Sequence, residues 1–444
     1  MTTRLQRTQG TATNRKKFTF SAWVKKASNV TGNDQVIYDT NLDADNRITV
    51  YFRGSTNNTL NIYGASSGSQ IIFLETTRLL RDISGWYHIV LAFDTTQATA
   101  ADRVKIYING TQETAFNSPS YPNQDIDLPT GTSSYVHSIG YYTHGGSSVF
   151  EGCMSHIHFT DGYAYAASDF GSTDNTTGEW KINTNPNVTY GNNGFFILKD
   201  GNSVTDQSPN TNNFTVDTGT LTKSEDNPSN VFATLNRLNN LNTNITFANG
   251  CLKLTVSGNW LGTTGTLGVT SGKYYWEVKN TGGGNFGAGI GKDAYGTSIR
   301  YFSVANNWLY DRSTNYGYYK NGSNYYKGNN STTTSYGADV GSNDVLMIAW
   351  DHDNGKIFLG KNGTWFDSGN PASGTNPAYT ITTEDAHWFP IFVGENNNIQ
   401  VNFGNGYFGS TAVSSAGTNA SNLGIFEYDV PSGFTALCTK GLNE

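Results

Sequence analysis

The stretch at residues 344–366, DVLMIAWDHDNGKIFLGKNGTWF, constrains the fold of this chain more than any other part of the sequence. Residues 345–350 are apolar at every position, so both faces of the strand that they predict would be buried. Asp353-Asn354-Gly355 follows, and these residues tolerate the positive φ of a tight hairpin turn. Residues 357–359 then read as the return strand, before a second turn at Lys361-Asn362-Gly363. This stretch predicts strands and tight turns inside a β-sandwich.

The same alternation of short apolar runs with Asn, Thr, Ser and Gly continues along all 444 residues, of which 50 are glycine. Charged residues make up 14% of the chain, against a usual share of about 25%. No helical heptads occur. The composition indicates an all-β fold, and the length suits two sandwiches, because one such domain often has about 200–250 residues. We expect one domain at residues 1–222, closed by an irregular segment at 162–222, and a second at 223–444.

Residues 18–24 predict a half-buried strand in the first domain. Phe18, Phe20, Ala22 and Val24 would lie on one face, and the residues between them on the other. Residues 85–94 form the longest apolar run of this half and predict a central strand. Three further short strands are expected at 36–39, 47–52 and 60–63.

Charge and targeting signals exclude several classes of protein. The net charge of −7 includes no basic block, so we expect neither nucleic-acid binding nor attraction to anionic membranes. No apolar run approaches the ~18 residues of a membrane span, and the N-terminus lacks the apolar stretch of a signal peptide. We therefore expect synthesis in the cytoplasm and no membrane insertion. The three cysteines are far apart, which argues against a disulfide framework.

Several segments resemble known binding modules. Residues 344–366, with YYWEV at 274–278, GAGIG at 287–291, WFP at 388–390 and VNFG at 401–404, resemble the SPRY (B30.2) domain. FTFSAWV at 18–24, GWYHIV at 85–90, KIYING at 105–110 and FEGCM at 150–154 resemble concanavalin A-like jelly rolls of the laminin-G and pentraxin type. The resemblance implies two tandem β-sandwiches, a jelly roll followed by a bent SPRY-like sandwich.

A third set of motifs resembles virion proteins of tailed bacteriophages, particularly those of marine hosts. The motifs are ASDFG at 167–171, YGNNGFFI at 190–197, DQSPNTNNF at 206–214, DNPSN at 226–230 and PSGFTALCT at 431–439. This resemblance implies a place on the virion surface, with other virion proteins as partners. From the usual assembly of phage fibres we expect a homotrimer.

The candidate ligand-binding residues lie in a stretch at 308–336 that holds seven tyrosines among Asn, Gly, Ser and Lys. Tyrosine gives large contact area at low entropic cost, which is typical of recognition loops, and aromatic faces stack on sugar rings. The alternative is a meander of strands with outward tyrosines, because tyrosine favours strands whatever its function. The candidates are Trp308, Tyr310, Tyr316, Tyr318, Tyr319, Tyr325 and Tyr326.

Calcium is the one cofactor that the resemblance implies, because laminin-G and pentraxin relatives often bind it at the sandwich rim. Asp39, Asp43, Asp45 and Asp94 lie in or beside expected loops and could supply its oxygen ligands. Solvated loop acids are the preferred interpretation, because aspartate in surface turns is common, so no cofactor is expected and calcium is the alternative. His156 and His158 share a strand without a third ligand and are interpreted as a packed or surface pair.

Catalysis is not expected. Glycoside hydrolases need two carboxyl groups about 5–9.5 Å apart, and no expected strand carries acids at that spacing. The hypothesis is a non-catalytic phage surface protein, of the tail-fibre, receptor-binding or head-fibre type, that binds host-surface glycan through loops. Two alternatives stay open: a capsid decoration or cement protein with a purely structural role, and a polysaccharide depolymerase.

Overall fold

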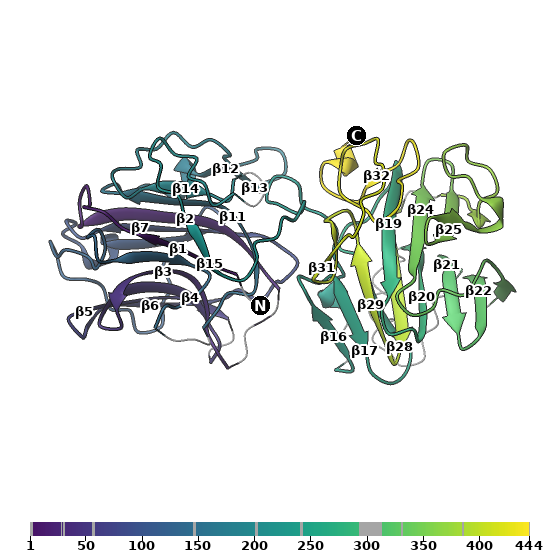
Figure 1. Ribbon diagram of the computed structural model, residues 1–444, viewed down its shortest axis with the longest axis horizontal. Coiled ribbons are helices and arrows are strands. Elements are labelled where there is room, and N and C mark those ends of the chain that lie inside the picture. Colours follow the sequence, from purple (N-terminus) through teal and green to yellow (C-terminus); the bar gives the residue numbers. More distant parts are fainter. Residues whose placement is uncertain are drawn as a thin grey trace. The chain divides into compact units, whose positions relative to one another are not determined.

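The computed structural model describes residues 3–27, 29, 32–55, 58–144, 148–199, 203–239, 243–292, 313–329, 332–383 and 386–443. The chain folds into two compact units, Met1–Lys223 and Ser224–Glu444. Figure 1 colours the first from purple to teal and the second from teal to yellow. Both units consist of β-sheets, as the sequence predicted, and the helices of the described residues are 3-10 turns of three residues each. None of these helices has the length and apolar character needed to cross a membrane.

The first unit is a sandwich of a seven-stranded and a six-stranded sheet. The seven-stranded sheet has the spatial order β15 (Thr215–Thr218), β1 (Arg4–Thr8), β10 (Val136–Ile139), β3 (Gln35–Asp43), β4 (Asn46–Arg53), β5 (Thr59–Ser66) and β6 (Ser69–Leu79). The six-stranded sheet has the order β14 (Phe195–Ile197), β11 (Gly152–Asp161), β2 (Lys17–Lys26), β7 (Tyr87–Asp94), β8 (Val104–Ile108) and β9 (Thr111–Glu113).

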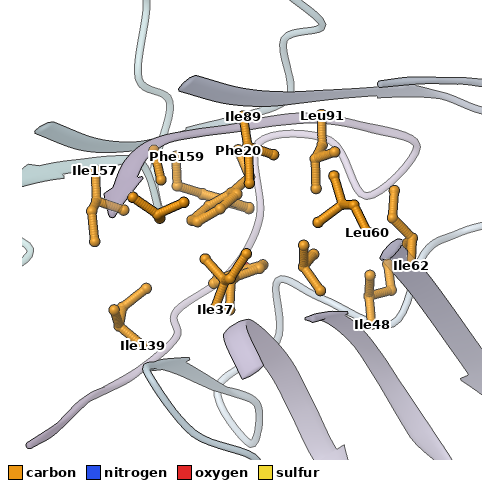
Figure 2. Close-up of a cluster of buried hydrophobic side chains, with 14 of the residues drawn as sticks. Phe20, Ile37, Ile48, Leu60, Ile62, Ile89, Leu91, Ile139, Ile157 and Phe159 are labelled. Carbon is orange, nitrogen blue, oxygen red and sulfur yellow. The ribbon is translucent and has the colours of Figure 1, made fainter. Parts of the chain in front are cut away.

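The core of the first unit lies between these two sheets. Figure 2 shows Phe20, Ile89 and Ile157 of the six-stranded sheet directed toward Ile37 and Ile62 of the seven-stranded sheet. Each of these side chains is fully buried, and burying an Ile or Phe contributes about 1.5–3 kcal/mol. The predicted inward face of residues 18–24 is confirmed, because its four members belong to this core.

The other face of β2 differs from the prediction of a half-buried strand. Ser21 and Trp23 are also buried, because the segment after β11 crosses the outer face of the six-stranded sheet (Figure 1). This segment includes β12 (Gly171–Thr173) and β13 (Trp180–Ile182). Its side chains pack against Val90 of β7. The outer face of the six-stranded sheet is therefore closed by the chain itself.

The second unit also contains two large sheets. The first follows the path β16 (Ile245–Ala248), β17 (Lys253–Val256), β29 (Asn397–Asn402), β19 (Lys273–Asn280), β24 (Val345–Asp351), β25 (Lys356–Lys361) and β26 (Thr364–Trp365), with β27 (Tyr379–Thr380) beside β25 and β32 (Thr435–Ala436) beside β19. The second has the order β18 (Leu261–Thr264), β28 (Trp388–Glu395), β20 (Asn285–Lys292), β21 (Asn315–Asn321), β22 (Asn324–Asn329) and β23 (Thr332–Ser335). A small hairpin joins β30 (Tyr407–Phe408) to β31 (Thr411–Ala412).

The hairpin predicted from residues 344–366 is confirmed by β24 and β25. Every residue of β24 is buried, and Ile348 lies opposite Leu359 across the hairpin. The turn between them uses Gly355 at a φ of 61°, and the amide of Asn354 donates hydrogen bonds to the carboxylate of Asp351. The apolar residues at 345–350 therefore correctly predicted a strand that is buried on both faces.

Candidate functional site

A row of side chains crosses the outer face of the seven-stranded sheet. One residue from each of the seven strands lies directly opposite a residue of the next strand, so that together they form a line across the sheet. Each of these residues has a direct neighbour in the chain that belongs to the core. Because successive side chains of a strand point to opposite faces, this row faces away from the core. We call it the outer row; its members are Thr215, Gln6, Ser138, Asp39, Thr49, Tyr63 and Phe73.

Asp39 is the acid at the centre of the outer row. The hydroxyl of Thr49 donates a hydrogen bond of 2.7 Å to one carboxylate oxygen, and the amide of Asn41 donates one of 2.5 Å to the other. Asp39 is 0% exposed. Burial raises the pKa of its carboxyl to about 6, although the Thr49 bond and the charge of Arg47 act to lower it. A carboxylate with this pKa changes charge under mildly acidic conditions.

The loop after β10 adds polar groups to the same face. The hydroxyl of Thr143 lies 3.0 Å from the Asn41 amide nitrogen and 3.0 Å from the hydroxyl of Ser138. Nε2 of His144 lies 3.1 Å from Oδ1 of Asn41. The short polar side chains of β3 and β10 are thus linked into one hydrogen-bonded network with the loop.

Tyrosine and arginine side chains lie beside this network. The guanidinium carbon of Arg47 is 4.9 Å from the ring centre of Tyr63 and 4.4 Å from that of Tyr142. The guanidinium carbon of Arg4 lies 5.0 Å from the ring centre of Tyr141. Arg4, Arg47, Tyr63 and Tyr142 are partly exposed. Cation–π contacts of this kind contribute about 0.5–1 kcal/mol at exposed sites and fix the positions of long side chains.

Together these groups form a candidate binding site on the outer face of the seven-stranded sheet, which we call the outer-face site. Its polar base is buried, and its accessible part consists of Arg4, Arg47, Tyr63, Tyr142, Thr143 and His144. Its partly or fully exposed groups are the two guanidinium groups, the hydroxyl of Thr143 and the imidazole of His144, beside the rings of Tyr63 and Tyr142. Such a set suits a ligand with many hydroxyl groups and an apolar ring face. Its residues are Arg4, Asp39, Asn41, Arg47, Thr49, Tyr63, Ser138, Tyr141, Tyr142, Thr143 and His144.

The four aspartates predicted for calcium lie in two different sheets. Asp39 and Asp43 belong to β3, with Asp45 in the turn that follows, whereas Asp94 ends β7. Asp94 accepts hydrogen bonds from Thr96 and Gln97. Nowhere in the described part of the chain do three His, Cys, Asp or Glu side chains gather as metal ligands would. Calcium binding at these aspartates stays a prediction.

The tyrosines predicted to lie on recognition loops lie on strands instead. Tyr316, Tyr318 and Tyr319 belong to β21, and Tyr325 and Tyr326 belong to β22. The expectation of loops is therefore wrong for these residues, because the stretch forms the meander that was the alternative interpretation.

Two of these tyrosines are not outward either. Tyr318 is 0% exposed, and its hydroxyl donates a hydrogen bond to the backbone carbonyl of Ala338. Tyr319 is 1% exposed, and its ring packs on Trp260. The candidates Trp308 and Tyr310 lie outside the described residues.

The outer-face site was not among the residues predicted to bind a ligand, except for Asp39. A signal for it exists in RITVYFR at 47–53 and TLNIYGA at 59–65, where polar or aromatic residues alternate with core residues. Alternation shows which side chains share a face. It does not show which face of a sheet the rest of the chain leaves open.

Comparison with known families agrees with the two sandwiches. A laminin G profile, described as the Concanavalin A-like lectin/glucanases superfamily, matches residues 2–169, and the SPRY domain profile matches residues 273–406. The chain contains a concanavalin A-like domain and a SPRY domain. The outer-face site belongs to the concanavalin A-like domain. The two domains indicate a binding role.

Several solved structures are also similar to the chain. The PSpry domain of TRIM65 has 12% identity and a TM-score of 0.29, and the match covers 38% of this chain and 91% of that one. Stonustoxin has 18% identity and a TM-score of 0.28, with 38% and 27% covered. The SPRY domain of human HERC1 has 19% identity and a TM-score of 0.27, with 35% and 91% covered. No curated protein matches the chain.

Proposed function

We propose that this chain is a non-catalytic glycan-binding protein and that the outer-face site of its concanavalin A-like domain holds the sugar. The observation that carries the proposal is that the polar groups of Thr143 and His144 and the rings of Tyr63 and Tyr142 lie partly or fully exposed beside Arg47 and the outer row. Sugars present hydroxyl groups at their edges and C–H groups on their faces. Polar side chains satisfy the first and aromatic rings the second.

The absence of catalysis is part of the proposal. Glycoside hydrolysis uses a pair of carboxyl groups, and Asp39 is the only acid among the residues of the outer row. Both oxygens of Asp39 already accept hydrogen bonds. These bonds suit a carboxylate that orients neighbouring donors rather than one that attacks a sugar.

We further propose that the protein is part of a tailed-phage particle, displayed on its surface as a homotrimer with other virion proteins, where it touches host-surface glycan. The support for this location is the resemblance of the motifs between residues 167 and 230 to phage virion proteins. Several copies on one particle would strengthen weak individual contacts through avidity. Immunogold labelling of phage particles tests the location, and absence of label from every particle would contradict it.

Glycan binding is tested by screening the purified full chain on a glycan array and on host envelope polysaccharide. The variants Tyr63→Ala and Tyr142→Ala should reduce binding at least fivefold, because each removes a ring from the outer-face site. Tyr163→Ala is the matched control, since Tyr163 is a 37% exposed tyrosine of the closing segment. Release of reducing ends from the polysaccharide would instead support a depolymerase, and binding that none of the variants alters would place the sugar elsewhere.

A further inference from the structure

Arg4 and Arg47 are charged groups of the outer-face site that form no ion pair in the described part of the chain. Arg53 on the same sheet, by contrast, pairs with Glu75 at 2.9 Å. The Nε atoms of Arg4 and Arg47 are buried and have no hydrogen-bond partner among the described residues. A buried donor without an acceptor lowers stability by about 1–3 kcal/mol. The positions of both arginine side chains therefore destabilise the fold to this extent.

Tyrosine rings determine which part of each guanidinium is left for a ligand. Aromatic rings can pack on the flat faces of a guanidinium, and the ring centres of Tyr63 and Tyr142 lie 4.9 and 4.4 Å from the guanidinium carbon of Arg47. Because Nε is buried, the part left for a ligand is the pair of terminal nitrogens, whose N–H groups form a planar fork that matches a carboxylate. Arg4 has the same arrangement with Tyr141, so the face carries two such forks.

The two arginines are spaced across the sheet. Arg4 lies on β1 and Arg47 on β4, and β10 and β3 run between these strands. At about 4.8 Å for each strand spacing, β1 and β4 are about 14 Å apart. Tyr141 and Tyr142 are consecutive, so the loop after β10 contacts both arginines. A polymer with repeated charges fits two separated forks better than a single charged sugar does.

From these contacts we infer that the outer-face site prefers glycans that carry carboxylate groups, such as polymers of uronic acids, with Arg4 and Arg47 as the residues that determine this preference. The inference rests on the proposed glycan-binding function and names the class of glycan.

Acidic side chains near the site are already engaged or lie to one side. Asp39 accepts bonds from Thr49 and Asn41, and Glu75 is paired with Arg53. Asp217 on β15 acts electrostatically on Tyr141 and Asp43 on His144. The preference therefore comes from directional hydrogen bonds of the two forks, since acidic groups on the same face oppose a simple attraction between opposite charges.

The test compares acidic polysaccharides with their carboxyl-reduced forms, in which each carboxylate becomes a CH₂OH group on the same backbone. The probes are polygalacturonate, alginate and hyaluronate, immobilised for binding measurements with the full chain. We expect at least tenfold tighter binding to an acidic form than to its reduced form. Arg47→Gln and Arg4→Gln should each lose at least fivefold in the ratio of affinity for the acidic form to affinity for the reduced form.

Arg81→Gln is the control, because it removes the same charge from an exposed loop residue outside the site. Circular dichroism checks that each variant remains folded, and Arg47→Lys separates the planar fork from the charge alone. If reduced and acidic forms bind equally through Tyr63, the preference is overturned and the proposed function stands. If none of the probes binds and the glycan array is also silent, both are overturned.

Discussion

The carboxylate of Glu277 in β19 accepts a hydrogen bond of 2.8 Å from the backbone N–H of Tyr428, 151 positions later in the chain. The neighbouring N–H of Glu427 donates a second bond of 3.0 Å, the hydroxyl of Tyr275 a third of 3.0 Å and the amide of Asn402 a fourth of 3.2 Å. Glu277 is fully buried. Through these hydrogen bonds, Glu277 connects residues 427–428 of the C-terminal segment to the sheet that contains β19.

Replacing Glu277 by glutamine should destabilise the second unit at pH 8, where the carboxyl is ionised because its pKa is about 7. In the parent protein, four donors find an acceptor in the carboxylate oxygens. Glutamine replaces one of these oxygens by an NH₂ group, which cannot accept, and an unsatisfied buried donor costs about 1–3 kcal/mol. Hydrogen exchange measured by mass spectrometry, residue range by residue range, would show faster exchange at 423–430. Glu427→Gln is the control because this carboxylate is partly exposed. Equal protection in Glu277→Gln and the parent protein would contradict the assigned role.

The pH dependence of the second unit should also reflect Glu277. Burial raises the pKa of Glu277 from 4.5 to about 7, so the folded state retains a proton that the unfolded state releases above pH 4.5. Stability contributed by this group is therefore lost as pH rises from 4.5 to about 7. Burial of His352 lowers its pKa and has the opposite effect, so the difference between the parent protein and Glu277→Gln isolates the glutamate. A pH-independent difference would refute the shift.

Buried histidines should make the first unit sensitive to acid. Burial lowers the pKa of His88 from 6.5 to about 3, and it holds those of His137 and His158 well below 6.5. The unfolded chain binds these protons first, so stability is lost as pH falls below 6.5. Asp39, with a pKa raised to about 6, opposes this trend. Urea unfolding of His137→Gln at pH 5 and pH 7 should show a smaller pH effect than the parent chain, and an unchanged effect would count against the prediction.

Trp180 should be needed to hold the closing segment on the six-stranded sheet. Its indole N–H donates a hydrogen bond of 2.9 Å to Nδ1 of His88, and the rings stack with centres 6.0 Å apart. Replacing a fully buried Trp by Ala lowers the free energy of unfolding by about 3–5 kcal/mol. Trp180 is partly exposed, so Trp180→Ala should lower it by less. We expect faster hydrogen exchange across residues 165–190.

A glycine beside the same ring provides a second test of this packing. A Cβ on Gly110 would lie 2.4 Å from the Trp180 ring, and Gly110 has a φ of 79°, which side chains rarely adopt. Gly110→Ala should therefore also release the closing segment. Gly178→Ala is the control, because its φ is 74° but nothing lies within 4 Å of its added Cβ. Similar behaviour of the two alanine variants would assign the effect to backbone strain instead of Trp180.

Local pattern was sufficient to predict much of the fold. The run at 345–350, the turn residues around Gly355 and the alternation of Phe18, Phe20, Ala22 and Val24 depend only on neighbouring residues, and the structure places them as expected. The same reasoning failed at Tyr318 and Tyr319. Their composition matched a recognition loop, yet they pair with Ala288 and Gly287 in a sheet.

The amino-acid sequence by itself determined the strands, the turns and the side chains that share a face, because these follow from backbone periodicity and local conformational preference. Only the tertiary structure decided which faces stay open. The segment after β11 covers the six-stranded sheet through Trp180, whereas Tyr63 and Arg47 on the seven-stranded sheet remain partly exposed. That difference arises from contacts between residues about 90 positions apart, such as Trp180 and His88, which the pattern along a single strand does not encode.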